Sequence, residues 1–226
     1  MRGRLLVLEG GEGVGKTTQW ERLAEQLGQT GRDVRVLREP GGTQAGDRIR
    51  ELLLDPDGTL APATEALLFA ASRAELITRE VRPVLDRGGV VLLDRYLLST
   101  YVYQGRARGL PIADLRAANR LATAGLVPDL TLLLTLPLEE ARQRARARLL
   151  PDRLERETEA FHERVAAGFA EASTAAWQAA HPECGPIVPV DAGGNRDVVT
   201  ARCLRVLEDR LPELLVPSTG IIQQAP

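Results

Sequence analysis

The sequence predicts an α/β fold with three layers, in which helices cover both faces of a parallel sheet of about five strands. Two observations support this prediction. Five short runs rich in Leu, Val and Ile are continuously apolar, which is typical of strands buried on both faces. Longer segments with helical spacing separate these runs, and a repeated strand, helix, strand order implies right-handed crossovers between parallel strands.

The predicted elements follow one another along the whole chain. The five strands are expected at residues 5–9, 34–37, 90–94, 130–136 and 186–191. Helical spacing of apolar residues is clearest around Trp20, Leu23, Ala24 and Leu27, and around Val199, Leu204, Leu207, Leu211 and Leu214. Glycine and proline clusters at 40–42, 88–89 and 193–194 mark the ends of elements.

Length and composition limit the possible classes of protein. The 226 residues are 44% apolar with a formal net charge of −2, which fits one domain over residues 1–215 and a flexible C-terminal tail over 216–226. No run approaches the roughly 18 apolar residues of a membrane span, and the N-terminus lacks a signal-peptide pattern. A charge near zero argues against a nucleic-acid binder. We therefore expect a cytoplasmic protein that binds neither membranes nor nucleic acids.

The strongest motif follows the first predicted strand. Residues 10–17 read Gly-Gly-Glu-Gly-Val-Gly-Lys-Thr, which matches the phosphate-binding loop G-x-x-x-x-G-K-[ST] between a strand and a helix. In such a loop, backbone N–H groups and the helix N-terminus face phosphate oxygens. Lys16 is the only lysine among 29 basic residues, and it is expected to reach the β and γ phosphates while Thr17 binds Mg²⁺. The sequence thus predicts a nucleoside triphosphate site formed by Gly10, Gly11, Glu12, Gly13, Val14, Gly15, Lys16, Thr17 and Thr18.

A phosphate-binding loop alone does not distinguish a kinase from a GTPase, a motor or a translocase. The usual guanine-reading motif Asn-Lys-x-Asp cannot occur, because the chain has no second lysine. A motor or translocase would normally need a larger core or further domains.

Further motifs resemble one family over nearly the whole chain. They are LEGGEGVGKTTQ at 8–19, REPGGT at 38–43, LLFAASRAEL at 67–76, DRYLLSTYVYQG at 94–105, PDLTLLL at 128–134 and RARARLLPDRLE from Arg144. In this order and spacing, the chain is similar to the thymidylate kinases of the bacterial type, within the nucleoside monophosphate kinases that carry a phosphate-binding loop. The resemblance implies transfer of a phosphoryl group from Mg-ATP to dTMP by a homodimer.

Strand-end chemistry and the resemblance together suggest catalytic roles. Asp94 ends the third predicted strand, where a carboxylate at the carboxyl edge of a parallel sheet can hold a metal or its waters. It could also merely cap the next helix. The resemblance implies that the neighbouring Arg95 reaches the phosphate of the acceptor.

The acceptor site is assigned through the resemblance. It implies that Phe69 stacks on thymine, Arg73 donates to its O4, Thr100 reads its edge, and Tyr103 lies where a ribose 2′-hydroxyl would project. Glu12 is assigned to the 3′-hydroxyl of the acceptor sugar. The remaining acceptor-site residues in this interpretation are Glu39, Pro40, Arg48, Arg95, Ser99 and Gln104.

Residues 142–156 contain six arginines around Leu149-Leu150-Pro151 and could be only a solvated helix face. Since positioned arginines stabilise the charge of a transferred phosphoryl group, we interpret the segment as a short lid. Arg144 and Arg148 are expected to contact ATP, and Arg153 is expected to be the catalytic arginine. The segment departs from the family pattern by lacking a Gly near its tip, which leaves open which arginine reaches the phosphoryl group.

Two other functions stay open at this point. A sibling enzyme could phosphorylate another nucleoside monophosphate or a deoxynucleoside, since the base-reading residues rest on the resemblance. A non-catalytic ATP-binding regulator would bind ATP without acceptor-stimulated ADP release. The presence of Asp94 and Arg95 together with the lid arginines argues against such a regulator, which would not need all of them.

Overall fold

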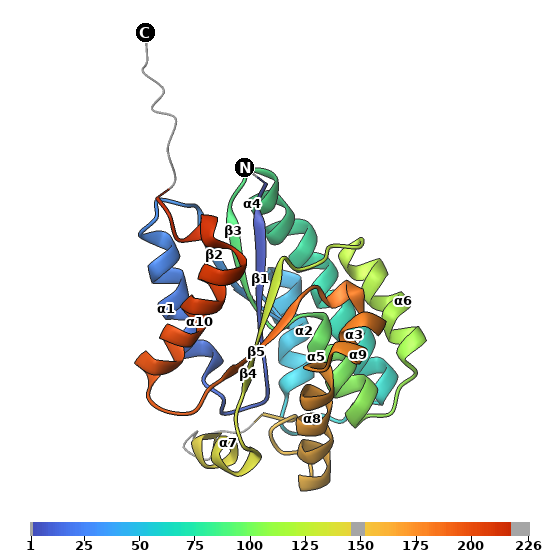
Figure 1. The fold of residues 1–226 in the computed structure, drawn as a ribbon. Coiled ribbons are helices and arrows are strands. Elements are labelled where there is room, and N and C mark those ends of the chain that lie inside the picture. Colours follow the sequence, from blue (N-terminus) through green and yellow to red (C-terminus); the bar gives the residue numbers. More distant parts are fainter. Residues whose placement is uncertain (1, 146–151, 218–226) are drawn as a thin grey trace.

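Five parallel strands form a sheet at the centre of the molecule (Figure 1). The structure is a computed structural model that describes residues 2–145 and 152–217. The sheet order is β2-β3-β1-β4-β5, and all four neighbouring pairs are parallel. The strands are β1 (Arg4–Glu9), β2 (Val34–Arg38), β3 (Val90–Asp94), β4 (Leu130–Thr135) and β5 (Ile187–Asp191). The predicted α/β class with a five-stranded parallel sheet is confirmed.

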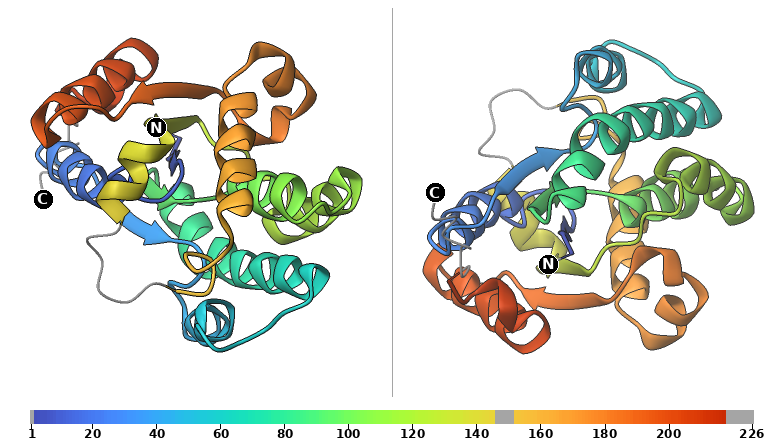
Figure 2. Two further views of the ribbon diagram at one scale, coloured as in Figure 1. Left: turned by 90° about the horizontal axis from the view of Figure 1, so that it is seen from below. Right: turned by 90° about the horizontal axis from the view of Figure 1, so that it is seen from above.

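Helices cover both faces of this sheet, as the views along the strands show (Figure 2). One face packs against α1 (Lys16–Gly28) and α10 (Arg196–Arg210). The other lies under α2 (Gln44–Leu54), α3 (Pro62–Leu76), α4 (Arg82–Asp86), α5 (Leu97–Thr100), α6 (Ile112–Thr123), α8 (Glu159–Ala172) and α9 (Ala175–Ala180). The short α7 (Leu138–Ala145) follows β4, and the π-helical η1 (Ile77–Val81) and η2 (Tyr101–Ala107) and the 3₁₀ turns η3 (Pro182–Cys184) and η4 (Pro212–Leu214) complete the elements. Every described helix is too short or too polar to span a bilayer.

The alternation of side chains along each central strand divides the core in two. In β1, Leu5 and Val7 belong to the cluster under α3, α5 and α8, whereas Leu6 and Leu8 belong to the cluster under α1 and α10. All four side chains are at most 1% exposed. Because successive residues of a strand point to opposite faces, a continuous apolar run fills both cores at once.

Two local predictions differ from the structure. Residues 34–37 were expected to be covered on both faces, yet β2 is an edge strand and Val36 is 48% exposed. The C-terminal helical spacing was expected to continue to Leu214, but α10 ends at Arg210, and a 3₁₀ turn begins at Pro212. Proline lacks the N–H that would continue the helix.

The strand order places a binding site at one edge of the sheet. The chain leaves β1 toward β2 and β3 on one side and returns to β4 and β5 on the other, so the strand order reverses at β1. Ligands of open parallel sheets bind outside the carboxyl ends of strands at such a point. The loop after β1 and the carboxyl end of β3 meet there, because Leu8 lies opposite Asp94.

Candidate active site

The loop between β1 and α1 has the conformation that a phosphate-binding loop needs. Gly13 and Gly15 have φ of 72° and 91°, in the left-handed region that favours glycine. A Cβ atom at Gly13 would lie 2.0 Å from the backbone oxygen of Ala141, so this loop also needs the close approach that only glycine allows. Gly15 directly precedes the first residue of α1, and the loop N–H groups therefore lie beside the positive end of the helix dipole.

Lys16 begins α1, and its side chain folds back onto the loop. Its Nζ donates to the carbonyl oxygens of Gly10 at 3.0 Å and Gly11 at 2.7 Å. Burial, reinforced by the positive charge of Arg95, lowers the pKa of Lys16 to about 7. The environment of Nζ thus disfavours the charged ammonium form of Lys16. A bound phosphate would stabilise that charge.

Asp94 and Thr17 form the part of the cavity suited to a metal. The Asp94 Oδ1 atom is buried without a hydrogen-bond partner among the described residues, and Thr17 lines the same cavity. An unpartnered carboxylate oxygen fits a hydrated Mg²⁺, which prefers oxygen ligands and keeps several waters. Residues 2–145 and 152–217 contain no cluster of three or more His, Cys, Asp or Glu residues that could cage a metal.

Arg95 sits on a strained backbone supported by a buried carboxylate. Its φ is 67°, which is uncommon for a residue with a side chain and is frequent at functional sites. Its Nη1 donates to the Gly10 oxygen and to Ser99 Oγ, both at 3.1 Å. Glu9 is fully buried, accepting backbone hydrogen bonds from Tyr96 at 2.8 Å and Ser99 at 3.0 Å. Glu9 thereby fixes the turn that carries Arg95.

One cavity of about 570 Å³ joins the loop to the predicted acceptor residues. The loop contributes Lys16, Thr17 and Thr18, and Asp94 and Arg95 also line the cavity. The predicted acceptor residues that line it are Glu12, Glu39, Pro40, Phe69, Arg73, Arg95, Ser99, Thr100, Tyr103 and Gln104. The structure therefore brings predicted acceptor-site residues and part of the predicted ATP site into one cavity, whereas Gly10, Gly11, Val14 and Arg144 do not line it.

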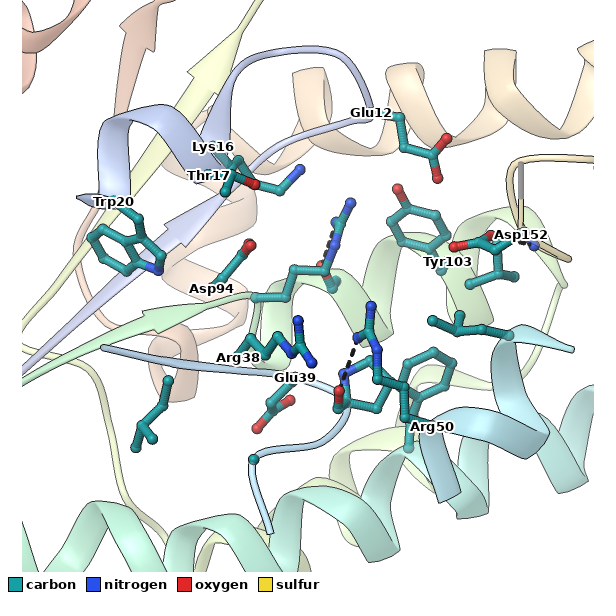
Figure 3. A pocket seen from close by; sticks show the side chains of 18 of the residues that line it. Glu12, Lys16, Thr17, Trp20, Arg38, Glu39, Arg50, Asp94, Tyr103 and Asp152 are labelled. Atoms are coloured by element: carbon teal, nitrogen blue, oxygen red, sulfur yellow. Dashed lines mark hydrogen bonds between the residues drawn. The ribbon is translucent and has the colours of Figure 1, made fainter. Parts of the chain in front are cut away.

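Two arginines that the sequence analysis did not select line the same cavity, whereas the selected Arg48 is exposed and does not. Arg38 ends β2 and Arg50 projects from α2 into the cavity (Figure 3). Arg50 also donates to the Pro40 oxygen at 2.9 Å. Burial and the nearby charge of Arg38 lower the pKa of Arg50, as expected for cations gathered without their anion. The structure thus favours Arg50 over Arg48 as a ligand for an acceptor phosphate.

Arg73 lines the cavity but is almost fully engaged within the protein. Its guanidinium donates to Glu39 Oε2 at 2.8 Å, Thr100 Oγ1 at 3.0 Å, Asn119 Oδ1 at 2.6 Å and the Tyr96 oxygen at 3.1 Å. Every guanidinium nitrogen therefore has an acceptor, and a base oxygen would have to share one of these donors. Arg73 therefore holds Glu39, Thr100 and Asn119 in place on the acceptor side of the cavity. It could also donate a hydrogen bond to a base.

Glu12 extends from the loop toward Tyr103 and away from Lys16 (Figure 3). Burial is the main cause that raises the pKa of Glu12, and the neighbouring Arg95 opposes it. The guanidinium of Arg95 also lies over the Tyr103 ring, 5.2 Å from its centroid. Glu12 thus faces the acceptor half of the cavity, where the resemblance places a sugar hydroxyl.

The structure separates the three selected arginines of the 142–156 segment. Arg153 is 8% exposed, donates through Nε to the Leu53 oxygen at 2.8 Å and pairs with Glu65 at 2.7 Å. Its Nη2 is buried without a hydrogen-bond partner among the described residues, but Nε and Nη1 tie Arg153 to α2 and α3, which favours an anchoring role over the expected catalytic one. Arg144 donates to the Ala192 oxygen at 3.1 Å in the loop before α10. Arg148 lies outside the described residues.

Several residues at the site were missed. Glu9 and Arg38 end their strands just as Asp94 does, so the rule that selected Asp94 could have found both. Arg50 and Glu65 lie within helices, where their contacts depend on distant segments and carry no local signal.

Comparisons with known proteins identify the family of the chain. The family model for thymidylate kinase matches residues 8–180. Thymidylate kinases of Synechococcus sp. (strain JA-2-3B'a(2-13)) and Deinococcus radiodurans are 48% and 43% identical, covering 92% of this chain and 95% and 98% of the relatives. A solved thymidylate kinase structure from Ehrlichia chaffeensis has a TM-score of 0.71 at 25% identity, over 92% of this chain and all of that one. The chain therefore belongs to the thymidylate kinase family and is a nucleoside monophosphate phosphotransferase.

Proposed function

We propose that this protein transfers the γ-phosphoryl group of Mg-ATP to dTMP, giving dTDP and ADP. One observation supports this proposal above the others: a phosphate-binding loop and a second cluster of cations line the same cavity. The second cluster consists of Arg38, Arg50 and Arg95, which suits a phosphate on the acceptor. A deoxynucleoside acceptor has no such phosphate and would leave these charges unmatched.

On the donor side, the chain supplies alignment and positive charge. The loop N–H groups and the start of α1 would bind the β and γ phosphates, and Lys16 would exchange its loop carbonyls for phosphate oxygens. Mg²⁺, when bound beside Thr17 and Asp94, would neutralise charge on the transferred group. These groups stabilise charge that spreads over the phosphoryl oxygens in the transition state.

On the acceptor side, little base catalysis is required. A nucleotide phosphate has a second pKa near 6, so its attacking oxygen is already mostly ionised at pH 7. Arg95 contacts both the loop and Ser99, and therefore lies where the two phosphates would meet. Phe69 offers an apolar ring to the acceptor base, and Thr100 and Gln104 offer polar groups to its edge. The buried Tyr103 beside Glu12 would disfavour an added 2′-hydroxyl.

Exclusion of water is the remaining requirement, because an exposed γ-phosphate would be hydrolysed. We propose that residues 142–156 act as the lid of a single kinase domain spanning 1–215. The guanidinium of Arg144 donates to the Ala192 and Gly194 oxygens in the loop that precedes α10. We propose that Arg144 contacts ATP from this position. With Arg153 anchored elsewhere, Arg148 is the remaining selected arginine for the transferred phosphoryl group.

We also propose that the protein is a homodimer. The adjacent helices α3 and α6 each leave an apolar face exposed, with Ala63, Leu67 and Ala71 on α3 and Ala113, Ala117 and Leu121 on α6. Leu67 is 63% exposed and Leu121 is 86% exposed, and neighbouring exposed apolar side chains are typical of a protein–protein interface. A self-complementary dimer would bury both faces. Light scattering should give twice the chain mass, and the double variant Leu67→Glu, Leu121→Glu should give a folded monomer; a monomeric unaltered protein would refute the dimer.

The reaction is tested by ADP release from Mg-ATP with dTMP, dUMP, UMP, CMP, AMP or GMP as the acceptor. We expect the highest kcat/KM with dTMP and a fall of about 10³-fold in acceptor-dependent release for Lys16→Met. If another monophosphate were preferred, the kinase reaction would be supported and the assignment of the base pocket would be refuted. If the protein bound ATP but released no ADP in response to an acceptor, the alternative of a non-catalytic ATP-binding regulator would be supported.

A further inference from the structure

Glu65 is a buried carboxylate for which the reaction described above has no use. It lies in the first turn of α3, and its side chain is completely buried. A buried carboxylate is costly unless charged or polar groups compensate it. In this protein, the compensating groups come from two segments that both contribute to the acceptor cavity.

Glu65 binds three side chains at once. Its Oε1 accepts hydrogen bonds from Gln104 Nε2 at 2.9 Å and Arg108 Nε at 3.2 Å. Its Oε2 accepts a hydrogen bond from Arg108 Nη2 at 2.9 Å and pairs with Arg153 Nη1 at 2.7 Å. Arg108 Nη2 also pairs with Glu157 at 2.6 Å. Two carboxylates and two guanidiniums thus form a charge-balanced network.

Gln104 links this network to the acceptor. It lines the cavity from η2, and its amide nitrogen is already committed to Glu65. The amide oxygen is therefore the atom left to accept a hydrogen bond from a ligand. Without Glu65, nothing among the described contacts would choose between the two orientations of this amide.

Arg153 links the same network to the C-terminal part of the 142–156 segment. Its backbone N–H donates to the Leu54 oxygen at 3.3 Å and its Nε to the Leu53 oxygen at 2.8 Å, at the end of α2. Asp152 and Leu154, on either side of Arg153, line the acceptor cavity. Glu65 therefore fixes a second wall of the cavity through Arg153.

We infer that Glu65 is a positioning residue that couples recognition of the acceptor to the placement of residues 152–157. It touches neither the loop nor the reacting phosphates, and it acts through Gln104 on one side and Arg153 on the other. The inference relies on the proposed function only for the identity of the acceptor.

The ionised form of Glu65 is the form that this network requires. Burial alone would raise the pKa of Glu65, but hydrogen bonds from Arg108, Gln104 and Arg153 outweigh it and keep the pKa below its usual value. Glutamine has the same shape but would offer an N–H₂ group to guanidinium donors. Glu65→Gln is therefore an isosteric change that breaks the network.

The first test is steady-state kinetics of Glu65→Gln. We expect the KM for dTMP to rise about tenfold, as for loss of one charge-assisted hydrogen bond, while the KM for ATP stays within about twofold. The matched control is Glu75→Gln, which makes the same change on the same helix in an exposed ion pair with Arg79. A KM for dTMP within twofold of the unaltered protein would overturn the inference.

A second variant separates positioning from simple stability. Glu65→Gln, Arg153→Met restores the charge balance, so the melting temperature should recover while the KM for dTMP stays raised. Joint recovery of both would show a purely structural role and refute the inference.

Hydrogen exchange provides a readout that needs no acceptor. In Glu65→Gln, amides of 152–157 should exchange at least about tenfold faster, whereas those of β1 should not change. Unchanged exchange at 152–157 would refute the coupling. If the unaltered protein failed to phosphorylate dTMP, the proposed function would fall, and this exchange measurement would still test Glu65.

Discussion

The donor and acceptor halves of the cavity are built in different ways. The proposed donor half comes from one continuous stretch, residues 10–18, and would bind phosphates through backbone N–H groups and a single lysine. The acceptor half collects side chains from the ends of β2 and β3, from α2 and α3, from η2 and from residues 152–155. Buried ion pairs such as Arg73 with Glu39 hold those side chains in place.

This difference determines how each half should respond to substitution. A loop made of backbone depends on glycine at particular dihedral angles and tolerates change where a Cβ meets open space. A binding site made of side chains depends on partners far apart in sequence. Substitutions in the acceptor half should therefore change the KM for dTMP and leave the KM for ATP nearly unchanged. Four substitutions or measurements test that contrast.

The largest effect is expected for Lys16→Met. Methionine keeps the unbranched stem and removes the charge that would meet the transferred phosphates, so kcat should fall by about 10³-fold. Steady-state ADP release measures this, with the KM for dTMP as the internal comparison. A loss smaller than tenfold would show that the donor half does not depend on its single lysine.

The next effect distinguishes two arginines of α2. Arg50→Met should raise the KM for dTMP by about 30-fold, because Arg50 lines the cavity and a charge-assisted hydrogen bond contributes about 2 kcal/mol. Arg48→Met is the matched control, since Arg48 is exposed on the same helix, and its KM should stay within about twofold. The reverse order would restore the original assignment of Arg48.

That pair also shows what the sequence could establish. The fold class, the phosphate-binding loop and the reaction class follow from patterns within a few residues or from strand ends, and these were predictable. The choice between Arg48 and Arg50 was not, because the two differ only in which face of α2 they occupy. That face is set by packing against α3.

The anchoring contacts of Arg153 were not predictable for a related physical reason. An arginine in an arginine-rich segment resembles a phosphate ligand in sequence, whereas its partner Glu65 lies on α3, far away along the chain. Only the folded structure reveals that a buried carboxylate already compensates this charge. Glu9 differs, because its position at the end of β1 gave a signal that could have been used.

A smaller effect should separate two glycines of the loop. Gly13→Ala places a Cβ against the backbone of Ala141 at a positive φ, and it should lower kcat/KM for ATP about tenfold. Gly11→Ala meets no atom within 4 Å and should change kcat/KM by less than about twofold. Both values come from the initial rate at low ATP with saturating dTMP. Equal effects would contradict a donor half built on backbone conformation.

The smallest expected signal is a fraction of a proton. The pKa of Lys16, lowered to about 7 mainly by burial, should rise when phosphates replace the loop carbonyls around its Nζ. Above pH 7 the free protein holds Lys16 mostly neutral, so binding of Mg-ATP should take up protons and weaken as the pH rises from 7 to 9. Calorimetry at pH 8 in buffers of different ionisation enthalpy measures this uptake. Lys16→Met should abolish it, and uptake that survives in the variant would place the titrating group elsewhere in the cavity.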